Sequence, residues 1–483
     1  MLFNSKVFVV FLLIVLAVYY RLGKEAKLWF LLGMSYIFYG FWNPWLCSLI
    51  LLSTVVDYFC ALRIDRAPTQ SQRKLWLGVS LAMNLGALGF FKYYNFFLDS
   101  LAFSLAGVGL PLDFERWHLQ LILPVGISFY TFQTLSYTIE VYRGNFKSDP
   151  NFRDFALFVA FFPQLVAGPV ERATHLLPQY KKDFRLTRAQ VTEGVFLILL
   201  GFVKKVVIGD RLGRWIEPQF AAPVEWGPDA LTSILLFTTQ IYVDFSAYSD
   251  IAIGLGRLLG YDIRPNFNLP FVVPSIPERW RRWHISMGHW FRDYIYFPLG
   301  GNRHGYWRTL ANIMAVMFLS GLWHGASYNF VIWGLLNGAT MVGHRVLSPV
   351  LRVMRAPFQA NAVLKWLYFY VCCANTMLMI SFINIFFRSD TWEVAKSYVF
   401  HLFLRSPWQY WRWIRRGLPM PEHYDDGFWM MWVVIGLHEA QRWFQLKERI
   451  LERPRVWAVV CSAMFLYVLL YGIKGPEFIY FQF

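Results

Sequence analysis

The chain has 483 residues, of which 57% are hydrophobic and 16% are charged, and its formal net charge is +16. Soluble proteins carry about 25% charged residues, so this composition excludes an ordinary soluble domain and predicts a chain that crosses a membrane many times. The basic residues stand in short clusters between apolar runs, which is typical of cytoplasmic membrane loops. We therefore expect contact with membrane lipids and no nucleic-acid partner.

Common catalytic and metal-binding motifs are absent. The sequence contains no GxGxxG after a strand, no GxxxxGK[ST] and no HExxH, so nothing indicates a dinucleotide site, a nucleoside triphosphate loop or a metalloprotease. The five cysteines lie inside apolar segments and have no metal-ligand spacing. We expect neither a disulfide framework nor a metal site.

The N-terminal part of the chain is predicted to form a series of membrane-spanning helices. Residues 7–20 predict a retained first span, and residues 28–62 predict a hairpin of two spans because Asn43, Pro44 and Trp45 form a turn signal. Basic loops at 21–27 and 63–74 predict an N-terminus outside the cytoplasm. A further span is expected at 75–91, followed by a mixed segment at 99–117 on the outer face.

The next part of the chain combines spans with polar interruptions. Residues 123–143 predict a span whose many hydroxyl groups either pack helices together or line a cavity, and packing is favoured. Pro163 and Pro169 interrupt residues 155–172, which predicts a re-entrant or short buried helix. Residues 193–209 predict a span whose Lys204 and Lys205 reach toward the interface.

Two acids lie within the apolar residues 229–260. Asp244 and Asp250 need partners there, and the arginines at 279–282 are the natural candidates. A structural ion pair and a catalytic role both remain open for each acid.

The remaining pattern sets the expected architecture. Later spans are expected at 325–344, 366–387, 428–445 and 456–472, with basic, tryptophan-rich loops at 345–365 and 388–427. The fold class is therefore all-α, a polytopic membrane bundle of about eleven spans plus re-entrant helices. No repeat or soluble domain is visible, which predicts a single domain, 1–483. The role of residues 401–427 stays open.

Histidine chemistry is the main candidate for function. His324 follows the apolar run 310–322, and an ionisable group at membrane depth is by default a functional hypothesis. Histidine can act as a general base near neutral pH, and Gly321 and Gly325 would let another chain or a substrate tail approach closely. His284 is the second candidate, with His289 nearby as an alternative. The remaining possibility is that either histidine only bonds a backbone carbonyl; for His324 we favour function.

Other residues near these histidines complete the candidate site. Arginine forms paired hydrogen bonds to phosphate or carboxylate, although a basic cluster can also anchor a loop at the membrane surface. The loop-like histidines His118, His175, His401 and His423 are expected to be ordinary. The candidate substrate-binding residues are Arg279, Arg281, Arg282, Trp283, Trp323 and Asp244.

Several motifs together resemble a known family. They are GLWHGASYNFVIWG (321–334), RWRRWHIS (279–286) with GHWFRDYIYFPLGGNR (288–303), LPVGISFYTFQTLSY (123–137), FFPQLVAGPV (161–170), YVDFSAYSDIAIGLG (242–256) and FIYFQF (478–483). They are similar to the membrane-bound O-acyltransferases, in the branch of the alginate O-acetyltransferase membrane protein. The resemblance covers nearly the whole chain; it departs at Ala247, where glycine is usual, and at Met287-Gly288-His289.

The resemblance implies an activity and a place. It implies acyl transfer from a thioester donor, acetyl-CoA at the cytoplasmic face, to an exopolysaccharide or cell-wall glycan, directly or through a periplasmic acetyltransferase-like partner. It also implies a catalytic core at about 120–345 with a central tunnel or two opposed funnels, in the bacterial inner membrane beside polysaccharide synthesis machinery. His324 matches the catalytic histidine. His284 matches a second polar position that is asparagine in many lipid-acylating relatives.

Three other functions compete with this reading. D-alanyl transfer toward teichoic acid, from a carrier protein, resembles the chain at the same motifs. Acylation of a lipid or protein is less favoured because the RRWH pattern is present. A transporter would predict paired half-repeats, and none is visible.

Overall fold

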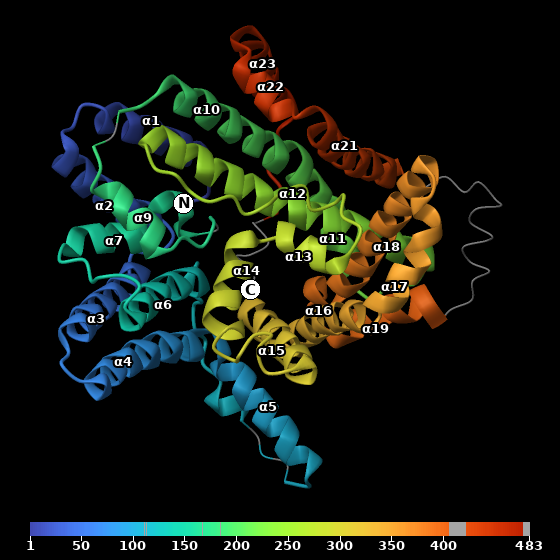
Figure 1. Cartoon of the computed structure of the whole chain (residues 1–483), viewed down its shortest axis with the longest axis horizontal. Coiled ribbons are helices and arrows are strands. Elements are labelled where there is room, and N and C mark those ends of the chain that lie inside the picture. Colours follow the sequence, from blue (N-terminus) through green and yellow to red (C-terminus); the bar gives the residue numbers. More distant parts are fainter. Residues whose placement is uncertain (111, 113, 167, 184, 405–421, 477–483) are drawn as a thin grey trace. The chain divides into compact units, whose positions relative to one another are not determined.

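The computed structural model describes residues 1–483 except 111, 113, 167, 184, 405–421 and 477–483. Helices, turns and loops make up this described part, which contains no strand, so the all-α prediction is confirmed (Figure 1). The chain divides into two compact units. Unit 1 comprises residues 1–198 and 251–264, and unit 2 comprises residues 199–250 and 265–483. Whether they form one domain, as the sequence predicts, stays a prediction.

Unit 1 is built from short-linked helices that begin and end close to the expected positions. Asn43 lies in the turn between Gly40 and Leu46, and a break at Phe161 splits residues 155–172 into two short helices, so the expected turn and the expected short helix are confirmed. The segment 99–117 is largely helical. The elements are α1 Lys6–Tyr19, α2 Lys24–Gly40, α3 Leu46–Arg66, α4 Gln70–Leu88, η1 Gly89–Tyr93, α5 Tyr94–Gly107, η2 Glu115–Trp117, α6 Ile127–Arg143, α7 Phe152–Ala160, α8 Phe162–Leu165, α9 Ala173–Tyr180 and most of α10 Arg188–Phe202.

Unit 2 holds the second half of the chain. Helix α12, Gly227–Leu259, passes from unit 2 into unit 1 at residue 250. The other elements are η3 Val203–Gly209, α11 Asp210–Phe220, α13 Ile276–Arg282, α14 Ile285–Phe291, η4 Arg292–Tyr296, α15 Tyr306–His324, α16 Tyr328–Val346, α17 Ser348–Arg355, η5 Ala356–Gln359, α18 Ala362–Arg388, α19 Trp392–Val399, η6 Phe400–Leu404, α21 Glu422–Phe444, α22 Leu446–Glu452 and α23 Pro454–Tyr471.

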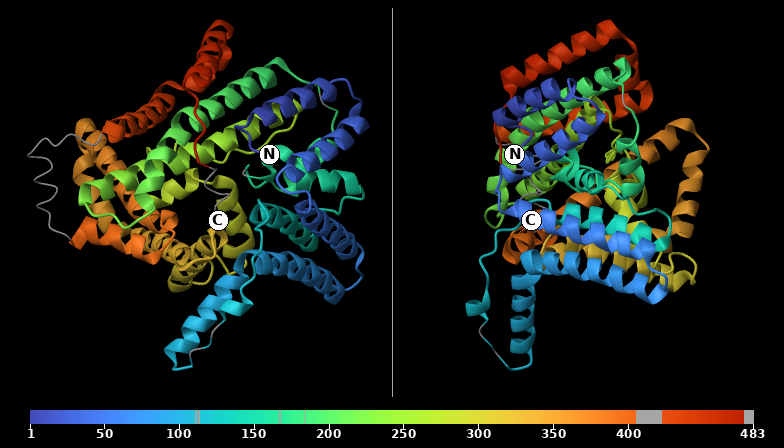
Figure 2. Two further views of the ribbon diagram at one scale, coloured as in Figure 1. Left: turned by 180° about the vertical axis from the view of Figure 1, so that it is seen from behind. Right: turned by 90° about the vertical axis from the view of Figure 1, so that its left-hand side faces the viewer.

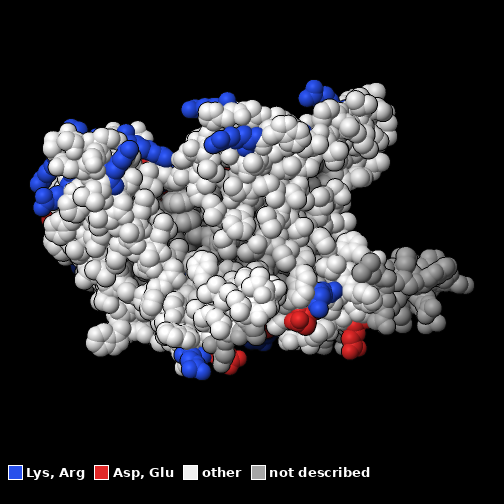
Figure 3. All heavy atoms as spheres, turned by 90° about the horizontal axis from the view of Figure 1, so that it is seen from below, with Lys and Arg blue, Asp and Glu red and all other residues white. Residues whose placement is uncertain are grey.

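The surface and helix lengths fit a membrane protein. Among the described residues, five stretches of helix are long and apolar enough to cross a bilayer: 46–66, 70–107, 227–259, 362–388 and 454–471. Large apolar side chains such as Leu13, Trp29 and Leu470 are exposed. The face in Figure 3 is mostly uncharged, with small groups of Lys and Arg and a few Asp and Glu. The count of about eleven spans stays a prediction.

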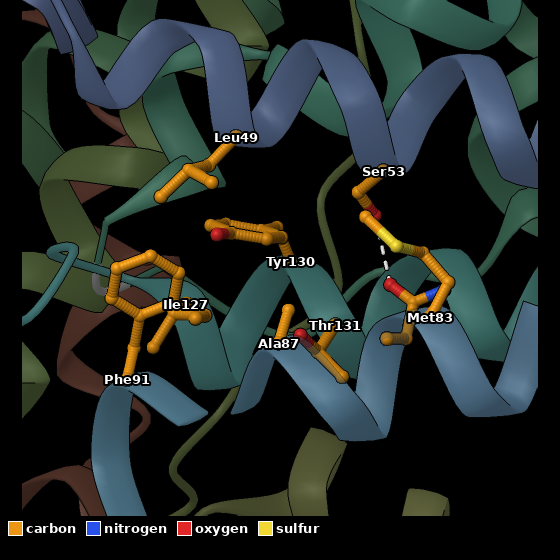
Figure 4. Close-up of a pocket in the computed structure, with 9 residues that line it drawn as sticks. Leu49, Ser53, Met83, Ala87, Phe91, Ile127, Tyr130 and Thr131 are labelled. Atoms are coloured by element: carbon orange, nitrogen blue, oxygen red, sulfur yellow. Dashed lines mark hydrogen bonds between the residues drawn. The ribbon is translucent and has the colours of Figure 1, made fainter. Parts of the chain in front are cut away.

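A polar network joins α3, α4 and α6 inside unit 1. The buried Asp57 carboxylate accepts hydrogen bonds from Ser80 Oγ at 2.6 Å and Asn84 Nδ2 at 2.8 Å. The Asn84 side-chain oxygen in turn accepts from Ser53 Oγ and Thr134 Oγ1. Each of these polar groups has a partner, so the Thr134 hydroxyl packs helices together, as favoured for this span. A small cavity lies beside the network (Figure 4), lined by Leu49, Ser53, Met83, Asn84, Ala87, Phe91, Ile127, Tyr130 and Thr131.

The acids of α12 pair with lysines of η3, not with arginines. Lys205 Nζ lies 2.5 Å from Asp244 Oδ1 and 2.9 Å from Asp210 Oδ1, and Lys204 Nζ lies 2.7 Å from Asp250 Oδ2. The expected arginine partners were therefore wrong, and so was the expectation that both lysines reach the interface, because Lys205 is 2% exposed. The physical reason is that η3 lies against the middle of α12. A buried charge is stable only with such a partner.

One of the histidines expected to be ordinary ties two segments of unit 1 together. His175 Nδ1 lies 2.9 Å from the buried Glu171 carboxylate, and its Nε2 lies 3.5 Å from Asp262. The side-chain amide of Gln179 also donates a hydrogen bond from Nε2 to Asp262 O and accepts one at Oε1 from Asp262 N. The hydrogen bonds to Asp262 and Glu171 raise the pKa of His175 to about 9. The residues after α12 are thus fastened to α9.

This arrangement predicts a pH-dependent contribution to stability. The pKa of His175 is about 6.5 in an unfolded chain and about 9 in the fold. Its ion pairs therefore stabilise fully below about pH 6.5, and this stabilisation is lost as the pH rises through about 9. We expect His175→Gln to cost roughly 1–2 kcal/mol at pH 6, allowing for screening at the half-exposed Asp262, and much less at pH 9.5.

Thermal unfolding of the full-length protein in detergent, measured across this pH range, checks the expectation. His118→Gln is the matched control, because His118 pairs with Asp99 at an exposed position. An unchanged gap between His175→Gln and the native protein from pH 6 to 9.5 would show that the charge on His175 contributes nothing.

Candidate active site in unit 2

The backbones of helices α15 and α16 approach so closely that they leave no room for a Cβ atom at the contact. A Cβ atom on Gly321 would lie 2.3 Å from Phe330 O and 3.1 Å from Gly334 Cα, and one on Gly334 would lie 2.4 Å from Met317 O. The two helices lie side by side in Figures 1 and 2. Small residues commonly permit such approach between membrane helices. The close approach expected at Gly321 is confirmed, but its partner is α16 and not a substrate tail.

The end of α15 places His324 among aromatic rings. His324 is 5% exposed, and its ring centroid lies 4.9 Å from that of Trp323, 5.0 Å from Trp333 and 5.1 Å from Phe387. Gly325 follows immediately, where a Cβ would overlap the Phe330 ring at 2.1 Å. The chain must therefore turn from α15 to α16 through a glycine, which fixes His324 at the last position of its helix.

A cavity opens beside His324. Its walls come from helices α12, α13, α15, α16 and α18 and from the residue after α13, and most of them are apolar or aromatic. The lining residues are Ile241, Arg279, Trp280, Trp283, His324, Trp333, Asn337, Ile380, Asn384 and Phe387. No Asp or Glu is among them. The cavity thus combines one histidine, one arginine and two amides in an otherwise apolar wall.

The three candidate arginines occupy different surroundings. Arg279 is 5% exposed, donates to Pro270 O at 3.1 Å, and stacks 4.0 Å from the Trp283 ring centroid. Arg281 and Arg282 both pair with Glu278 at 2.8 Å, and the Arg281 side chain is 74% exposed. Only Arg279 therefore reaches the cavity.

His284 is held rigidly in an unusual backbone conformation. It is fully buried, precedes α14 and has φ of 44°, in the left-handed region that is uncommon for residues other than glycine. Asn266 Oδ1 accepts hydrogen bonds from the Ser286 backbone N and Oγ and lies 3.1 Å from His284 Nδ1. Because that oxygen only accepts, His284 Nδ1 carries the proton, and Nε2 is left as the basic nitrogen. Such strain persists where the surroundings enforce it, often at functional sites.

The two histidines are linked through one ring. Trp323 lies 6.0 Å from His284 and 4.9 Å from His324, measured between ring centroids. His284 does not line the cavity, and its ring also faces Phe245 at 4.7 Å. The alternative, His289, is exposed. The structure thus places His324 on the cavity wall. His284 does not line the cavity and instead packs against Trp323.

Several lining residues were missed by the sequence reasoning. Asn384 accepts a hydrogen bond from Trp333 Nε1 at 3.2 Å and donates to Thr238 at 3.1 Å, so it joins α16, α18 and α12 around the cavity. The apolar run of α18 contains two amides, Asn375 and Asn384, and they were an available signal. Asp244, by contrast, does not line the cavity and is paired with Lys205. Residues 401–427, the other open region, lie mostly outside the described residues.

The sequence match to known proteins covers this whole site. Residues 139–387 match the model of the membrane-bound O-acyltransferase family, and both histidines and all ten cavity-lining residues fall within that range. The chain belongs to the membrane-bound O-acyltransferase family. It is therefore an acyltransferase and a multi-pass membrane protein.

Three relatives of this acyltransferase have names that refer to three different polymers, alginate, peptidoglycan and teichoic acid. It is 40% identical over 411 residues to the Probable alginate O-acetylase AlgI of Pseudomonas aeruginosa, covering 85% of this chain and 76% of that relative. It is 35% identical over 433 residues to the Peptidoglycan O-acetyltransferase of Helicobacter pylori, covering 82% and 78%. The Teichoic acid D-alanyltransferase of Bacillus subtilis is 28% identical over 241 residues, covering 46% of this chain and 58% of that relative.

The packing of α15 on α16 yields a matched pair of substitutions. We expect Gly334→Ala to lower the unfolding midpoint and the acyl-transfer rate, because the new Cβ forces the two backbones apart at a cost of about 1–3 kcal/mol. Gly343→Ala lies on the same helix with nothing within 4 Å of its Cβ. It should be neutral or stabilise by about 0.5–1 kcal/mol, the usual preference for alanine in a helix.

Both variants are compared by thermal unfolding and by thioester consumption in the same detergent. Equal effects of Gly334→Ala and Gly343→Ala would contradict a specific backbone contact between the helices.

Proposed function

We propose that this acyltransferase moves an acetyl group from acetyl-CoA to a hydroxyl of an exopolysaccharide or cell-wall glycan, with His324 as the general base. The observation that carries this proposal is the buried position of His324 on the wall of a cavity that lies within the family match. The names of the alginate and peptidoglycan relatives support acetyl as the transferred group and a glycan as the acceptor class.

The chemistry follows from the position of His324. The acceptor hydroxyl attacks the thioester carbonyl while the imidazole takes its proton. The tetrahedral oxyanion then collapses, the carbon–sulfur bond breaks, and the imidazolium returns the proton to the leaving thiolate. A positioned base contributes about 10²–10⁴-fold to such a step. The rings of Trp323, Trp333 and Phe387 keep bulk water away from the reacting carbonyl, which limits hydrolysis.

His284 is a positioning residue in this proposal. Its Nδ1 proton is held by Asn266, and its ring packs on Trp323, which in turn packs on His324. Loss of His284 would loosen Trp323 and thereby the catalytic imidazole, without removing the base itself.

The three arginines are proposed to contact different parts of the acetyl-CoA donor. Arg281 and Arg282 lie on the more exposed side of α13 beside Glu278 and are proposed to meet the phosphates of coenzyme A. Arg279 would face the thioester end inside the cavity, and Trp283 and Trp323 would pack against the donor and the imidazole. Asp244 is engaged by Lys205, and we assign it no substrate contact.

The setting of the reaction is proposed from the family resemblance of the sequence. The donor would enter from the cytoplasmic face of the bacterial inner membrane, and the acetyl group would leave toward the opposite face, to glycan directly or to a periplasmic acetyltransferase-like partner associated with polysaccharide synthesis. D-alanyl transfer toward teichoic acid is the second candidate, because a D-alanyltransferase matches part of the chain. Acylation of a lipid or protein is the third.

Replacement of the histidines tests the proposed base. We expect His324→Ala to abolish acetylation of envelope polysaccharide, and His284→Ala to leave a measurable residue, because only His324 takes the proton. Acetyl content of the isolated polymers is measured against the amount of protein in the membrane. His289→Ala, an exposed histidine of the same stretch, is the control and should retain native acetylation.

Two outcomes would overturn these roles. Native acetylation by a well-expressed His324→Ala protein would remove the catalytic assignment. A larger loss from His284→Ala than from His324→Ala would exchange the roles of the two histidines.

A further inference from the structure

Arg279 is a buried cation without an anionic partner among the described residues. Guanidinium carries five N–H donors and stays protonated in proteins, yet its one hydrogen bond goes to Pro270 O. Its other contacts are the faces of Trp283 and Phe271, at 4.0 and 5.4 Å. The neighbouring acid, Glu278, is taken by Arg281 and Arg282. A positive charge therefore stands on the cavity wall without a described carboxylate to neutralise it.

A structural role alone explains this charge poorly. The other buried cations described in unit 2, Lys205 and Arg388, each lie within 3.5 Å of a carboxylate, and the half-buried Lys204 lies 2.7 Å from Asp250. This is how a folded chain normally offsets the loss of hydration. Removing a guanidinium from water without an anion is costly, and its stacking on Trp283 recovers only part of that cost. A charge retained in this way points to a ligand in the cavity.

The rest of the wall indicates which ligand charges are tolerated. The indole Nε1 of Trp280 is buried and has no acceptor in the part of the chain that the structure describes, so it adds a second donor next to Arg279. The side-chain oxygen of Asn337 is buried and receives no hydrogen bond from a described residue, but it is a neutral acceptor. No acid among the described residues lines the cavity. An electron-rich carbonyl oxygen suits these donors, whereas an ammonium group would meet the guanidinium with no described carboxylate in the wall to offset the repulsion.

We infer that Arg279 makes this cavity selective for acyl groups without a positive charge, so that acetyl-type donors are accepted and aminoacyl donors are rejected. The inference rests on the proposed acyl transfer at His324 and adds a specificity-determining residue to it. It separates the first candidate function from the second, because a D-alanyl thioester carries an ammonium group two atoms from the sulfur-bound carbon at neutral pH.

Two donors of equal size test this selectivity. The propionyl and glycyl groups have the same number of heavy atoms and differ in a terminal methyl against an ammonium. Two unit charges roughly 6 Å apart at an effective dielectric constant near 20 give about a 100-fold discrimination. With full-length protein in lipid nanodiscs at about pH 6.5, below the pKa of an α-amino group at about 7.7–8.0, we expect kcat/KM for thiol release to be about 100-fold higher for propionyl-CoA than for glycyl-CoA.

Substitutions assign the discrimination to Arg279. Arg279→Gln should reduce the propionyl-to-glycyl ratio at least tenfold, and Arg279→Lys should keep most of it because the charge remains. Arg281→Gln is the matched control on the same helix, exposed and paired with Glu278, and should leave the ratio unchanged. Because each variant is judged by a ratio of two donors, a general loss of activity does not imitate the effect.

The outcomes are separable from those of the proposed function. Equal use of both donors by the native protein, or the same ratio in Arg279→Gln, would overturn the inference. If native protein consumes neither thioester, the proposed donor is wrong. The charge in the cavity is then measured by the rates at which charged reagents modify a cysteine placed on its wall.

For this cysteine-modification measurement, Ile380→Cys on the cavity wall is made in a background where the five native cysteines are replaced. Anionic methanethiosulfonate should modify Cys at this position at least tenfold faster, relative to the cationic reagent, when Arg279 is present than in Arg279→Gln. The same relative rate in both proteins would overturn the inference independently of any donor.

Discussion

The candidate site depends on the contact between α15 and α16 at Gly321 and Gly334. Backbone atoms meet there at distances that leave no room for a Cβ, so the two helices cannot separate or slide without losing the contact. This packing fixes the end of α15, where His324 lies, against Trp333 of α16. Asn384 then ties α16 to α18 and α12. A short stretch of sequence, 321–334, thus supplies both the proposed base and the packing that positions it.

Buried charges in unit 2 serve two different purposes. Lys204 and Lys205 are neutralised by the acids of α12 and α11, which fastens η3 to its neighbours and keeps those charges out of the cavity. Arg279 has no such partner among the described residues and faces the cavity. In a low-dielectric interior the uncompensated charge dominates the local potential. The ion pairs of η3 therefore stabilise the fold, whereas the charge on Arg279 acts on the ligand in the cavity.

Much of this arrangement follows from sequence pattern, and the rest required the tertiary structure. Hydropathy and turn signals predicted the helices and the hairpin at Asn43, and the position of His324 after an apolar run predicted its burial. The partners of Asp244 were assigned wrongly because the choice between lysines and arginines depends on which helices are neighbours. The environment of His175 was missed because Asp262 is distant in sequence. The separation of Arg279 from the two following arginines depends on the orientation of one short helix, which periodicity over seven residues does not fix.

The central claim is that the thioester carbonyl reaches His324 inside the cavity of unit 2. An experimental structure of the full-length protein with a non-hydrolysable acetyl-CoA analogue, in which a methylene group links sulfur to the acetyl carbon, tests this claim most directly. The account predicts that the acetyl carbonyl lies in the cavity, within reach of His324 and facing Arg279, with the phosphates near Arg281 and Arg282. An acetyl group bound elsewhere, with this cavity closed to it, would contradict the account.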